Sequence, residues 1–259
     1  MQFSQVIMIG DVVGETGLLA LESLLPTIIE EYKAAFVVVN GENVAEGFGM
    51  TAVDLDRILA AGADVVTSGN HVWEKREFYS TLEAETRVLR PANYPAGSAG
   101  HGWAMIEKAG LNWLVVNLQG RELMTPIDCP FKTFDAIKQT AQTPLILVDF
   151  HAEVTKEKES LTHYLDGRAS LVVGTHTHVQ TADERILSNG TGCITDLGMT
   201  GVIESVIGMD KKICLDRART QILFRMECAK GISAVQGIVA GIDPETGKAL
   251  TIQRLNRKA

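Results

Sequence analysis

The sequence lacks long apolar runs and has a shortage of basic residues. No apolar stretch approaches the ~18 residues that a membrane-spanning helix needs, so we expect no membrane segment. Lysine and arginine number 24 against 32 aspartates and glutamates, which gives a formal net charge of −8. Stable binding to a nucleic-acid backbone needs a basic face, so this acidic balance argues against a nucleic-acid partner.

Cysteine is scarce, and the chain has no Cys-x-x-Cys pair. The four cysteines are Cys129, Cys193, Cys214 and Cys228, and no two are close in sequence. This spacing favours buried thiols in a reducing compartment over a disulfide framework. The first apolar run has no basic stretch before it and stops at Asp11, so we expect no signal peptide. Together these features predict a cytoplasmic protein.

Two common phosphate-binding signatures are also missing. Residues 10–17 are rich in glycine, but no Gly-Lys-Ser/Thr follows them, and the dinucleotide fingerprint G-x-G-x-x-G does not occur. A nucleotide-binding P-loop is therefore excluded. We interpret these glycines as a tight turn, or as a place where the backbone approaches a site closely.

What is present is the composition of one globular domain of 259 residues, with 46% apolar and 22% charged residues. Up to residue 193, short apolar runs alternate with amphipathic segments such as residues 17–33. Later, residues 192–195, 220–227, 234–241 and 250–255 read as consecutive strands. This order predicts an α/β fold with a mixed sheet, or with two sheets face to face and helices outside. Residues 199–216 are expected to form a long loop or small cap.

Polar side chains follow five of the predicted strands, at the points where these strands end. Because ligands bind beyond the carboxyl ends of strands in open α/β sheets, we expect these turns to converge on one site. The metal-capable and polar residues they carry are Asp11, Glu42, Asn43, Asn70, His71, His151, His176 and His178.

The chemical types of these residues point to transition metals. Carboxylates, a carboxamide and imidazoles without a thiolate suit manganese, iron or zinc better than calcium. The candidate ligands outnumber the three or four of a single catalytic zinc, which favours two ions sharing the Glu42 carboxylate. Two ions can activate water and hold both oxygens of an in-line displacement at phosphorus. The six candidate ligands are Asp11, Glu42, Asn70, His151, His176 and His178.

Taken singly, most of these residues have ordinary structural explanations. An aspartate or asparagine after a strand is commonly a turn residue. The strongest local signal is His176-Thr177-His178, because residues two apart share a face of a continuing strand. Four of the six histidines fall at predicted strand ends, whereas His101 and His163 are expected at the surface.

At these positions the chain resembles the calcineurin-like metallophosphoesterase superfamily, in order and spacing, from residue 6 to about residue 180. It departs from that pattern in having Val13 where a histidine is usual and Glu42 where an aspartate is usual. Both departures, and residues 68–73 and 195–201, resemble the YmdB-type bacterial branch. The matching segments are Gly10-Asp11-Val12-Val13, Asn40-Gly41-Glu42-Asn43, Gly69-Asn70-His71, Asp149-Phe150-His151 and Gly174-Thr175-His176-Thr177-His178.

The resemblance implies a four-layer αββα sandwich of two mixed sheets with a small cap. It implies hydrolysis of small phosphodiesters, in particular 2′,3′-cyclic and also 3′,5′-cyclic nucleotides, with iron or manganese, or else zinc. His71 would be the catalytic residue that is not a ligand. Asp11, Glu42 and His178 would hold metal one, with Asn43 near it, and Glu42, Asn70, His151 and His176 would hold metal two.

Three alternatives remain at this point. The first alternative is an amidohydrolase barrel. The order of the motifs fits it poorly, because the His-x-His of such a barrel usually lies near the first strand, whereas here it begins at residue 176. A metal-containing module that senses a nucleotide with little turnover is the second alternative, because metal one lacks a histidine. The third concerns assembly, since a homo-oligomer fits a cytoplasmic enzyme as well as a monomer does.

Overall fold

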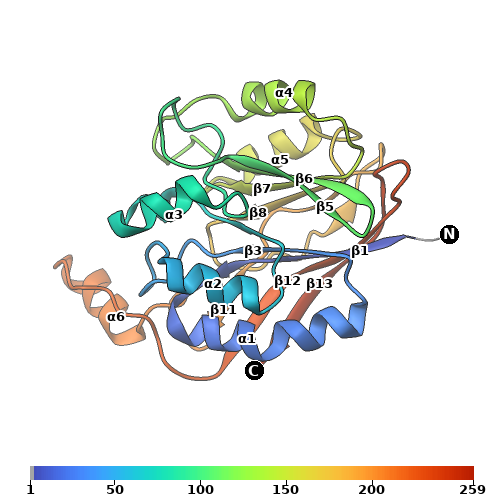
Figure 1. Ribbon diagram of the computed structural model, residues 1–259. Coiled ribbons are helices and arrows are strands. Elements are labelled where there is room, and N and C mark those ends of the chain that lie inside the picture. The colour runs from blue at the N-terminus through green and yellow to red at the C-terminus, as the bar shows by residue number, and fades with distance from the viewer. Residues whose placement is uncertain (1–2) are drawn as a thin grey trace.

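Two mixed β-sheets pack face to face, and helices cover the outer face of each (Figure 1). The computed structural model describes residues 3–259. The seven-stranded sheet has the order β2-β11-β12-β1-β3-β4, with β13 also paired to β12. Its strands are β1 (Ser4–Ile9), β2 (Asp11–Val12), β3 (Phe36–Asn40), β4 (Val65–Thr67), β11 (Met199–Val202), β12 (Ser233–Ile242) and β13 (Ala249–Lys258).

The six-stranded sheet has the order β5-β6-β7-β8-β10-β9. Strands β6, β7, β8 and β10 run parallel, whereas β5 and β9 are antiparallel to their neighbours. Its strands are β5 (Trp103–Lys108), β6 (Leu111–Gln119), β7 (Ile146–His151), β8 (Leu171–Thr175), β9 (Arg185–Ile186) and β10 (Gly192–Ile194).

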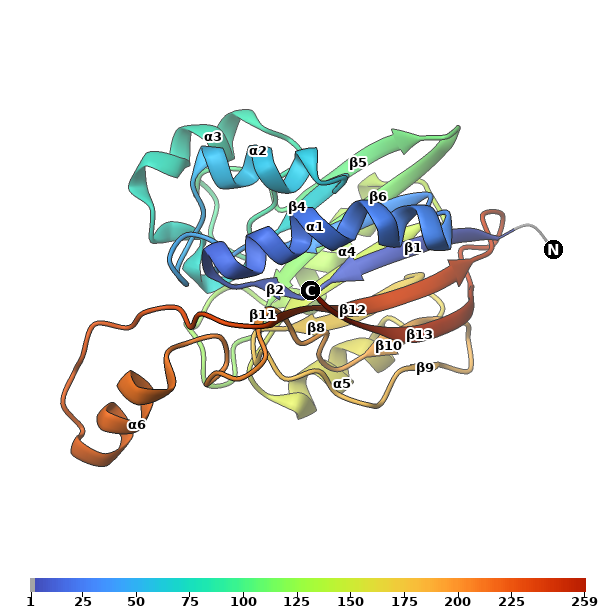
Figure 2. The ribbon, with the colours of Figure 1, turned by 90° about the horizontal axis from the view of Figure 1, so that it is seen from below.

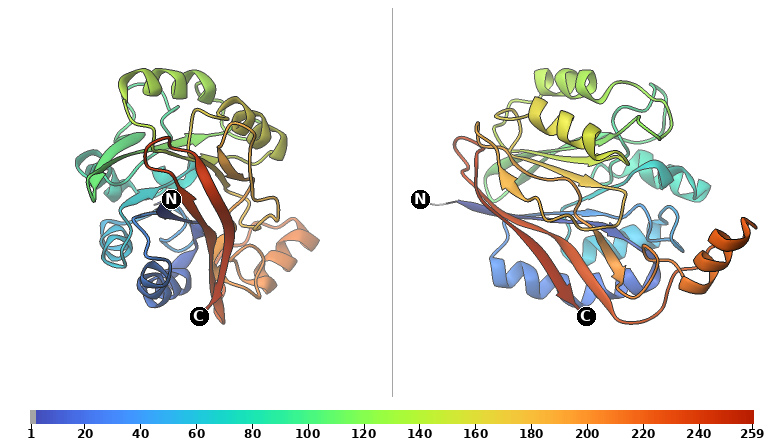
Figure 3. Two further views of the ribbon diagram at one scale, coloured as in Figure 1. Left: turned by 90° about the vertical axis from the view of Figure 1, so that its right-hand side faces the viewer. Right: turned by 180° about the vertical axis from the view of Figure 1, so that it is seen from behind.

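The helices complete the four layers. Helices α1 (Gly14–Tyr32) and α2 (Ala52–Ala60) lie on the seven-stranded sheet, and α4 (Pro130–Thr140) and α5 (Thr155–Tyr164) lie on the six-stranded sheet (Figure 3). The short helix α3 (Tyr79–Ala84) follows two 3₁₀ turns, Asn70–Trp73 and Arg76–Phe78. The four-layer αββα sandwich expected from the sequence is confirmed. No helix within residues 3–259 combines the length and apolar character needed to cross a bilayer.

Three apolar layers hold the sandwich together, and β3 contributes side chains to two of them. Val37 and Val39 pack toward Leu21 of α1, whereas Val38 packs between the sheets near Trp113. Successive strand residues point to opposite faces, so a strand covered on both faces must be apolar at every position. A third cluster joins β6 and β7 to α4 and α5.

The parallel pairings bring the strand ends that precede the candidate site residues to one edge of the sandwich. Strands β1, β3 and β4 run in the same direction in one sheet, as do β7 and β8 in the other. In the second sheet His151, the last residue of β7, pairs in register with Thr175, the last residue of β8. The turns that follow these strands therefore meet where the two sheets face each other.

The structure differs from the sequence prediction in the region of residues 199–227. Residues 199–202 form β11 inside the sheet rather than a loop, and α6 (Lys211–Thr220) follows (Figure 2). The strand predicted over residues 220–227 is wrong, because residue 220 ends α6 and residues 221–227, most of which are exposed, have no sheet partner. Their run of apolar residues resembled a strand, but strand propensity depends on neighbours that this segment lacks.

Candidate metal centre

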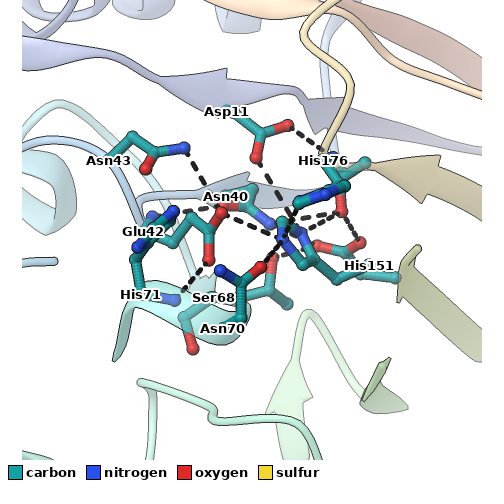
Figure 4. A network of polar contacts seen from close by, with 12 residues as sticks. Asp11, Asn40, Glu42, Asn43, Ser68, Asn70, His71, His151 and His176 are labelled. Atoms are coloured by element: carbon teal, nitrogen blue, oxygen red, sulfur yellow. Dashed lines mark hydrogen bonds and ion pairs between the residues drawn. The ribbon is translucent and has the colours of Figure 1, made fainter. Parts of the chain in front are cut away.

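The turns after β1, β3, β4, β7 and β8 bring the candidate residues into one network of polar contacts (Figure 4). Both sheets contribute, because Asp11 and Glu42 follow strands of the first sheet while His151 ends a strand of the second. Asp11, Glu42, Asn43 and His151 are all buried, and His176 is half-buried. The convergence that the sequence predicted is therefore present in the structure.

The centre of the network is the Nε2 atom of His151. It lies 2.9 Å from Glu42 Oε1, 3.1 Å from Asn70 Oδ1 and 3.0 Å from His176 Nδ1. Ligand atoms of Glu42, His151 and His176 all lie within 4.8 Å of one another. The other ring nitrogen of His176 lies 3.1 Å from Glu153 Oε2. Because that carboxylate accepts a hydrogen bond from the Nε2–H, Nδ1 directs its lone pair into the centre.

His151 is oriented by a hydroxyl and a carboxylate behind it. Thr175 Oγ1 donates to Asp149 Oδ1 at 2.7 Å and lies 2.9 Å from His151 Nδ1. Since the hydroxyl proton is used on Asp149, Thr175 accepts from the Nδ1–H of His151. This leaves Nε2 directed at Glu42, which is the arrangement of a ligand histidine supported by an outer carboxylate.

Asp149 is held in place by two further donors. Asn40 donates to its Oδ2 at 3.0 Å, and Thr67 donates to the same oxygen. Burial raises the pKa of Asp149, while these hydrogen bonds and the charge of His151 oppose the rise. The sequence analysis missed Asp149 as a supporting residue. Its spacing of two residues from His151 on one strand is the signal that could have revealed it.

Replacing Thr175 with valine is expected to weaken metal binding about 10–100-fold, the usual effect of removing an outer partner of a ligand histidine. Valine keeps the shape of threonine but provides no oxygen for the Nδ1–H of His151. Titration of the metal-free protein with manganese measures the change. Thr175→Ser retains the hydroxyl and should restore affinity. Equal affinities of the valine variant and the wild-type protein would show that Thr175 has no such role.

Asp11 and His178 face each other across a second part of the centre. Oδ1 of Asp11 is buried without a hydrogen-bond partner among residues 3–259, and it lies 3.9 Å from His178 Nε2. The Nδ1–H of His178 donates to the carbonyl of Ile207 at 2.8 Å. Asn43 Nδ2 lies 3.0 Å from Nε2, whose lone pair it can meet as a donor. An unpartnered buried carboxylate oxygen next to an imidazole lone pair suits a cation.

The protonation states of the buried groups show how strongly the centre favours positive charge. Burial raises the pKa of Asp11 to about 7, although nearby histidines oppose this. Burial alone would raise the pKa of Glu42, but the charge and hydrogen bond of His151 lower it to about 2. Burial likewise opposes charge on His151, yet Glu42, Asp11 and Asp149 raise its pKa to about 9. The carboxylates thus hold a proton where a metal ion could replace it.

His176 and His178 are held in a strained backbone conformation. Their φ angles are 98° and 64°, in the left-handed region that residues with side chains rarely adopt. Asp196 supports the loop between them, because it accepts from the backbone N–H of Thr177 at 3.2 Å and from its hydroxyl at 2.7 Å. Buried Lys158 pairs with the same carboxylate at 2.8 Å. Strain of this kind persists where the surroundings fix it, commonly at functional sites.

These two supporting residues differ in how far the sequence reveals them. Asp196 lies in the stretch of residues 195–201 that carries the family resemblance, but it was not named as a site residue. Lys158 has no visible signal, because a lysine on a predicted helix is normally exposed, whereas its side chain here is almost fully buried.

Gly69 lets the backbone pass close to the centre. A Cβ atom at this position would lie 2.2 Å from His151 Cδ2 and 2.3 Å from Glu42 Oε2. Only glycine fits between these two side chains without moving them. The glycine before Asn70 is therefore required by the space that the centre occupies.

His71 lies at the mouth of the centre rather than inside it. Its backbone N–H donates to Glu42 Oε2 at 3.2 Å, while its ring stands edge-on to Phe48 with centroids 5.1 Å apart. Its Nδ1 lies 3.4 Å from Glu74 Oε1, and the side chain is 26% exposed. The imidazole can therefore meet a bound molecule. The other two histidines, His101 and His163, are exposed as expected.

Comparisons with known proteins agree with this geometry. The model of the YmdB-like protein family matches residues 7–255. A Bacillus subtilis protein named 2′,3′-cyclic-nucleotide 2′-phosphodiesterase is 44% identical over 253 residues, covering 97% of this chain and 96% of the relative.

Two solved structures share the whole fold. One is a hypothetical protein of Thermus thermophilus, with a TM-score of 0.93, 40% identity and coverage of 98% of this chain and 99% of the other. The second is a protein of Mycoplasma pneumoniae described as a novel phosphatase, with a TM-score of 0.94, 28% identity and coverage of 100% and 94%. The strand-end residues, the αββα sandwich and the match across residues 7–255 lead to one conclusion: the chain belongs to the YmdB-like family and has a phosphoesterase fold.

Proposed function

We propose that this protein is a metal-dependent phosphodiesterase that hydrolyses cyclic nucleotides. We expect 2′,3′-cyclic nucleotides to be its preferred substrates, ahead of 3′,5′-cyclic nucleotides. The observation that carries the proposal is the buried cluster of carboxylate, carboxamide and imidazole groups around His151 Nε2, next to the unpartnered Oδ1 of Asp11. The name of the Bacillus subtilis relative supports the substrate class. We further propose that the substrate is a small molecule, that the protein acts in the cytoplasm, and that residues 1–259 form one domain.

The residues fit two metal ions, with iron or manganese as the first choice and zinc as the second. Bound ions of this kind supply a Lewis acid for the phosphoryl oxygens and an activated water near neutral pH. Glu42 presents its two oxygens in different directions, one to His151 and the other to the backbone N–H of His71. Asp11, Glu42, Asn43 and His178 would hold the first ion, and Glu42, Asn70, His151 and His176 the second.

The protein residues orient the ligands and move a proton. Thr175 and Asp149 fix the ring of His151, and Asp196 fixes the turn that carries His176. His71 stands at the mouth, where its ring can donate a proton to the ribose oxygen that leaves phosphorus. A positioned acid of this kind contributes roughly 10²–10⁴-fold to the rate.

The test is hydrolysis of 2′,3′-cyclic AMP, 3′,5′-cyclic AMP and a chromogenic phosphodiester. Chelator-stripped protein should be inactive, and the same protein reloaded with manganese, iron or zinc should turn over the 2′,3′-cyclic substrate fastest. Protein that holds two ions per chain and hydrolyses none of these would overturn the proposal. Tight stoichiometric nucleotide binding without product would then favour a nucleotide-sensing module.

A further inference from the structure

The side-chain amide of Gln119 is buried without an acceptor. Gln119 is the last residue of β6, and its side chain is 0% exposed. Its Nε2 atom has no hydrogen-bond partner among residues 3–259. Buried polar groups in proteins are nearly always hydrogen-bonded, and an exception requires an explanation. The amide therefore indicates an acceptor that comes from outside the chain.

The sheet places this amide next to the metal centre. Trp113 and Val115 of β6 pack between the two sheets, whereas Leu118 packs in the cluster under the outer helices. Because side chains alternate along a strand, Gln119 faces the space between the sheets. It pairs in register with His151 on the neighbouring strand β7. Its side chain therefore lies one strand spacing, about 4.8 Å, from the histidine at the middle of the centre.

Tyr94 fixes the direction of the amide. Its hydroxyl donates to Gln119 Oε1 at 3.1 Å, so the amide oxygen is used and the two hydrogens of Nε2 remain free. The Tyr94 ring stands edge-on to Trp73, with centroids 5.1 Å apart, and Trp73 ends the 3₁₀ turn that begins at Asn70. Burial raises the pKa of Tyr94, two neighbouring side chains oppose this, and the charge of Glu42 adds to it. Tyr94 thus lies within electrostatic reach of the centre.

The residue before Tyr94 holds the backbone of Gln119. Asn93 Oδ1 accepts from the N–H of Gln119 at 2.8 Å, and Asn93 Nδ2 donates to the carbonyl of Gln119 at 2.8 Å. The same Nδ2 donates to the carbonyl of Asp128 at 2.9 Å, and the Asn93 side chain is almost fully buried. Two adjacent residues therefore fix both the backbone and the amide of Gln119. A donor held in this way is preorganised for its partner.

The chemistry of the donor indicates what that partner is. An amide N–H carries a partial positive charge, so it does not bind a metal ion, and its partner is an acceptor oxygen. The amide adjoins His151, one of the residues that would hold the second ion, and is closed off from solvent. Only the part of a substrate that enters the centre can reach it. In a phosphodiester this part is the phosphate, whose non-bridging oxygens accept hydrogen bonds.

Building on the proposed function, we propose that Gln119 donates a hydrogen bond from Nε2 to a non-bridging oxygen of the substrate phosphate. Tyr94 is a positioning residue, which holds the amide for this contact through Oε1. The contact is made to the phosphate and not to the base or ribose. It therefore serves every phosphodiester that enters the centre to the same extent.

The test is the binding of inorganic phosphate to the manganese-loaded protein, measured by isothermal titration calorimetry. Gln119→Met keeps the length of the side chain but removes the donor. It should bind phosphate about 10–100-fold more weakly, the usual effect of losing a hydrogen bond to a charged group, and should hold as much metal as the wild-type protein. Gln119→Glu keeps the shape and the acceptor for Tyr94, and it should weaken binding at least as much. The KM values for 2′,3′-cyclic AMP and the chromogenic diester should rise by similar factors.

A double-mutant cycle tests the part of Tyr94. Tyr94→Phe should weaken phosphate binding about 2–10-fold, because the ring remains and one neutral hydrogen bond is lost. In the Gln119→Met background the same change should have no further effect, since Tyr94 acts only through the amide. Losses that multiply in the double variant would show that Tyr94 acts independently of Gln119 and would remove it as a positioning residue.

The matched controls are Gln139→Met and Tyr164→Phe, which change partly or fully exposed side chains on the helices α4 and α5. Both should bind phosphate like the wild-type protein. Wild-type affinity in Gln119→Met, or a wild-type protein that binds no phosphate, would overturn the proposal. Loss of metal from Gln119→Met would make Gln119 a ligand, and weakening confined to 2′,3′-cyclic AMP would move the contact to the nucleoside, so either would also overturn it. Phosphate binding needs no turnover, so its result is separate from a failure of the proposed hydrolysis.

Discussion

Replacing Glu42 with glutamine is expected to reduce bound metal below two ions per chain and to lower kcat by about 10³-fold. Glutamine keeps the shape of glutamate, but it removes the negative charge that lies 2.9 Å from His151 Nε2. Bound ions supply several kcal/mol of charge stabilisation in such reactions, and each 1.36 kcal/mol is a factor of about ten in rate. Metal content by mass spectrometry and turnover of 2′,3′-cyclic AMP measure the two effects.

Glu30→Gln is the matched control, because Glu30 is exposed near the C-terminal end of α1 and takes no part in the contacts of the centre. This variant should keep the metal content and kcat of the wild-type protein. A Glu42→Gln variant with two ions per chain and unchanged kcat would contradict the role of Glu42 as a shared ligand. It would also show that the low pKa of Glu42 reflects an ion pair with His151 alone.

Replacing His71 with alanine is expected to lower kcat by about 10²–10⁴-fold and to leave metal content intact. The ring lies at the mouth and contacts Phe48 and Glu74, whereas the contact with Glu42 comes from the backbone N–H, which alanine retains. The structure therefore separates the imidazole, for which we propose a catalytic role, from the backbone contact. Comparing single-turnover rates with metal content at equal protein concentration tests the separation.

The control for this prediction is His163→Ala, which removes an exposed imidazole on α5. Its activity should match that of the wild-type protein. Loss of an ion from His71→Ala would make His71 a ligand and remove it as the proton donor. An unchanged kcat with full metal content would show that His71 does not protonate the leaving-group oxygen.

Most of the centre could be predicted because its residues lie where strands end. Asp11, Glu42 and His151 each follow or end a continuous apolar run, and parallel pairing brings such ends to one edge. The supporting residues could not be found in this way. The contact of Thr175 with Asp149 depends on the register between two strands, which hydrophobic pattern alone does not fix.

The strand expected over residues 220–227 was wrong for a related reason. Residues 222–224 are apolar and fit a strand as well as they fit an unpaired segment, since the sequence does not show whether a neighbouring strand exists. Lys158 is a similar case, because the burial of its charge requires a partner that lies far away in sequence, here Asp196. Both cases depend on long-range contacts rather than on local propensity.

The position of β1 has a consequence for biosynthesis. This strand lies inside the seven-stranded sheet, and it pairs over its whole length with β12, from Ser4 with Ile242 to Ile9 with Gly237. At the usual rate of about 5–20 residues per second, the ribosome needs roughly 10–50 s to make the chain between these strands. During that time one edge of β1 has no native partner, and exposed strand edges are prone to mispairing. The sheet that carries Asp11 is therefore complete only after the last two strands of the chain have emerged.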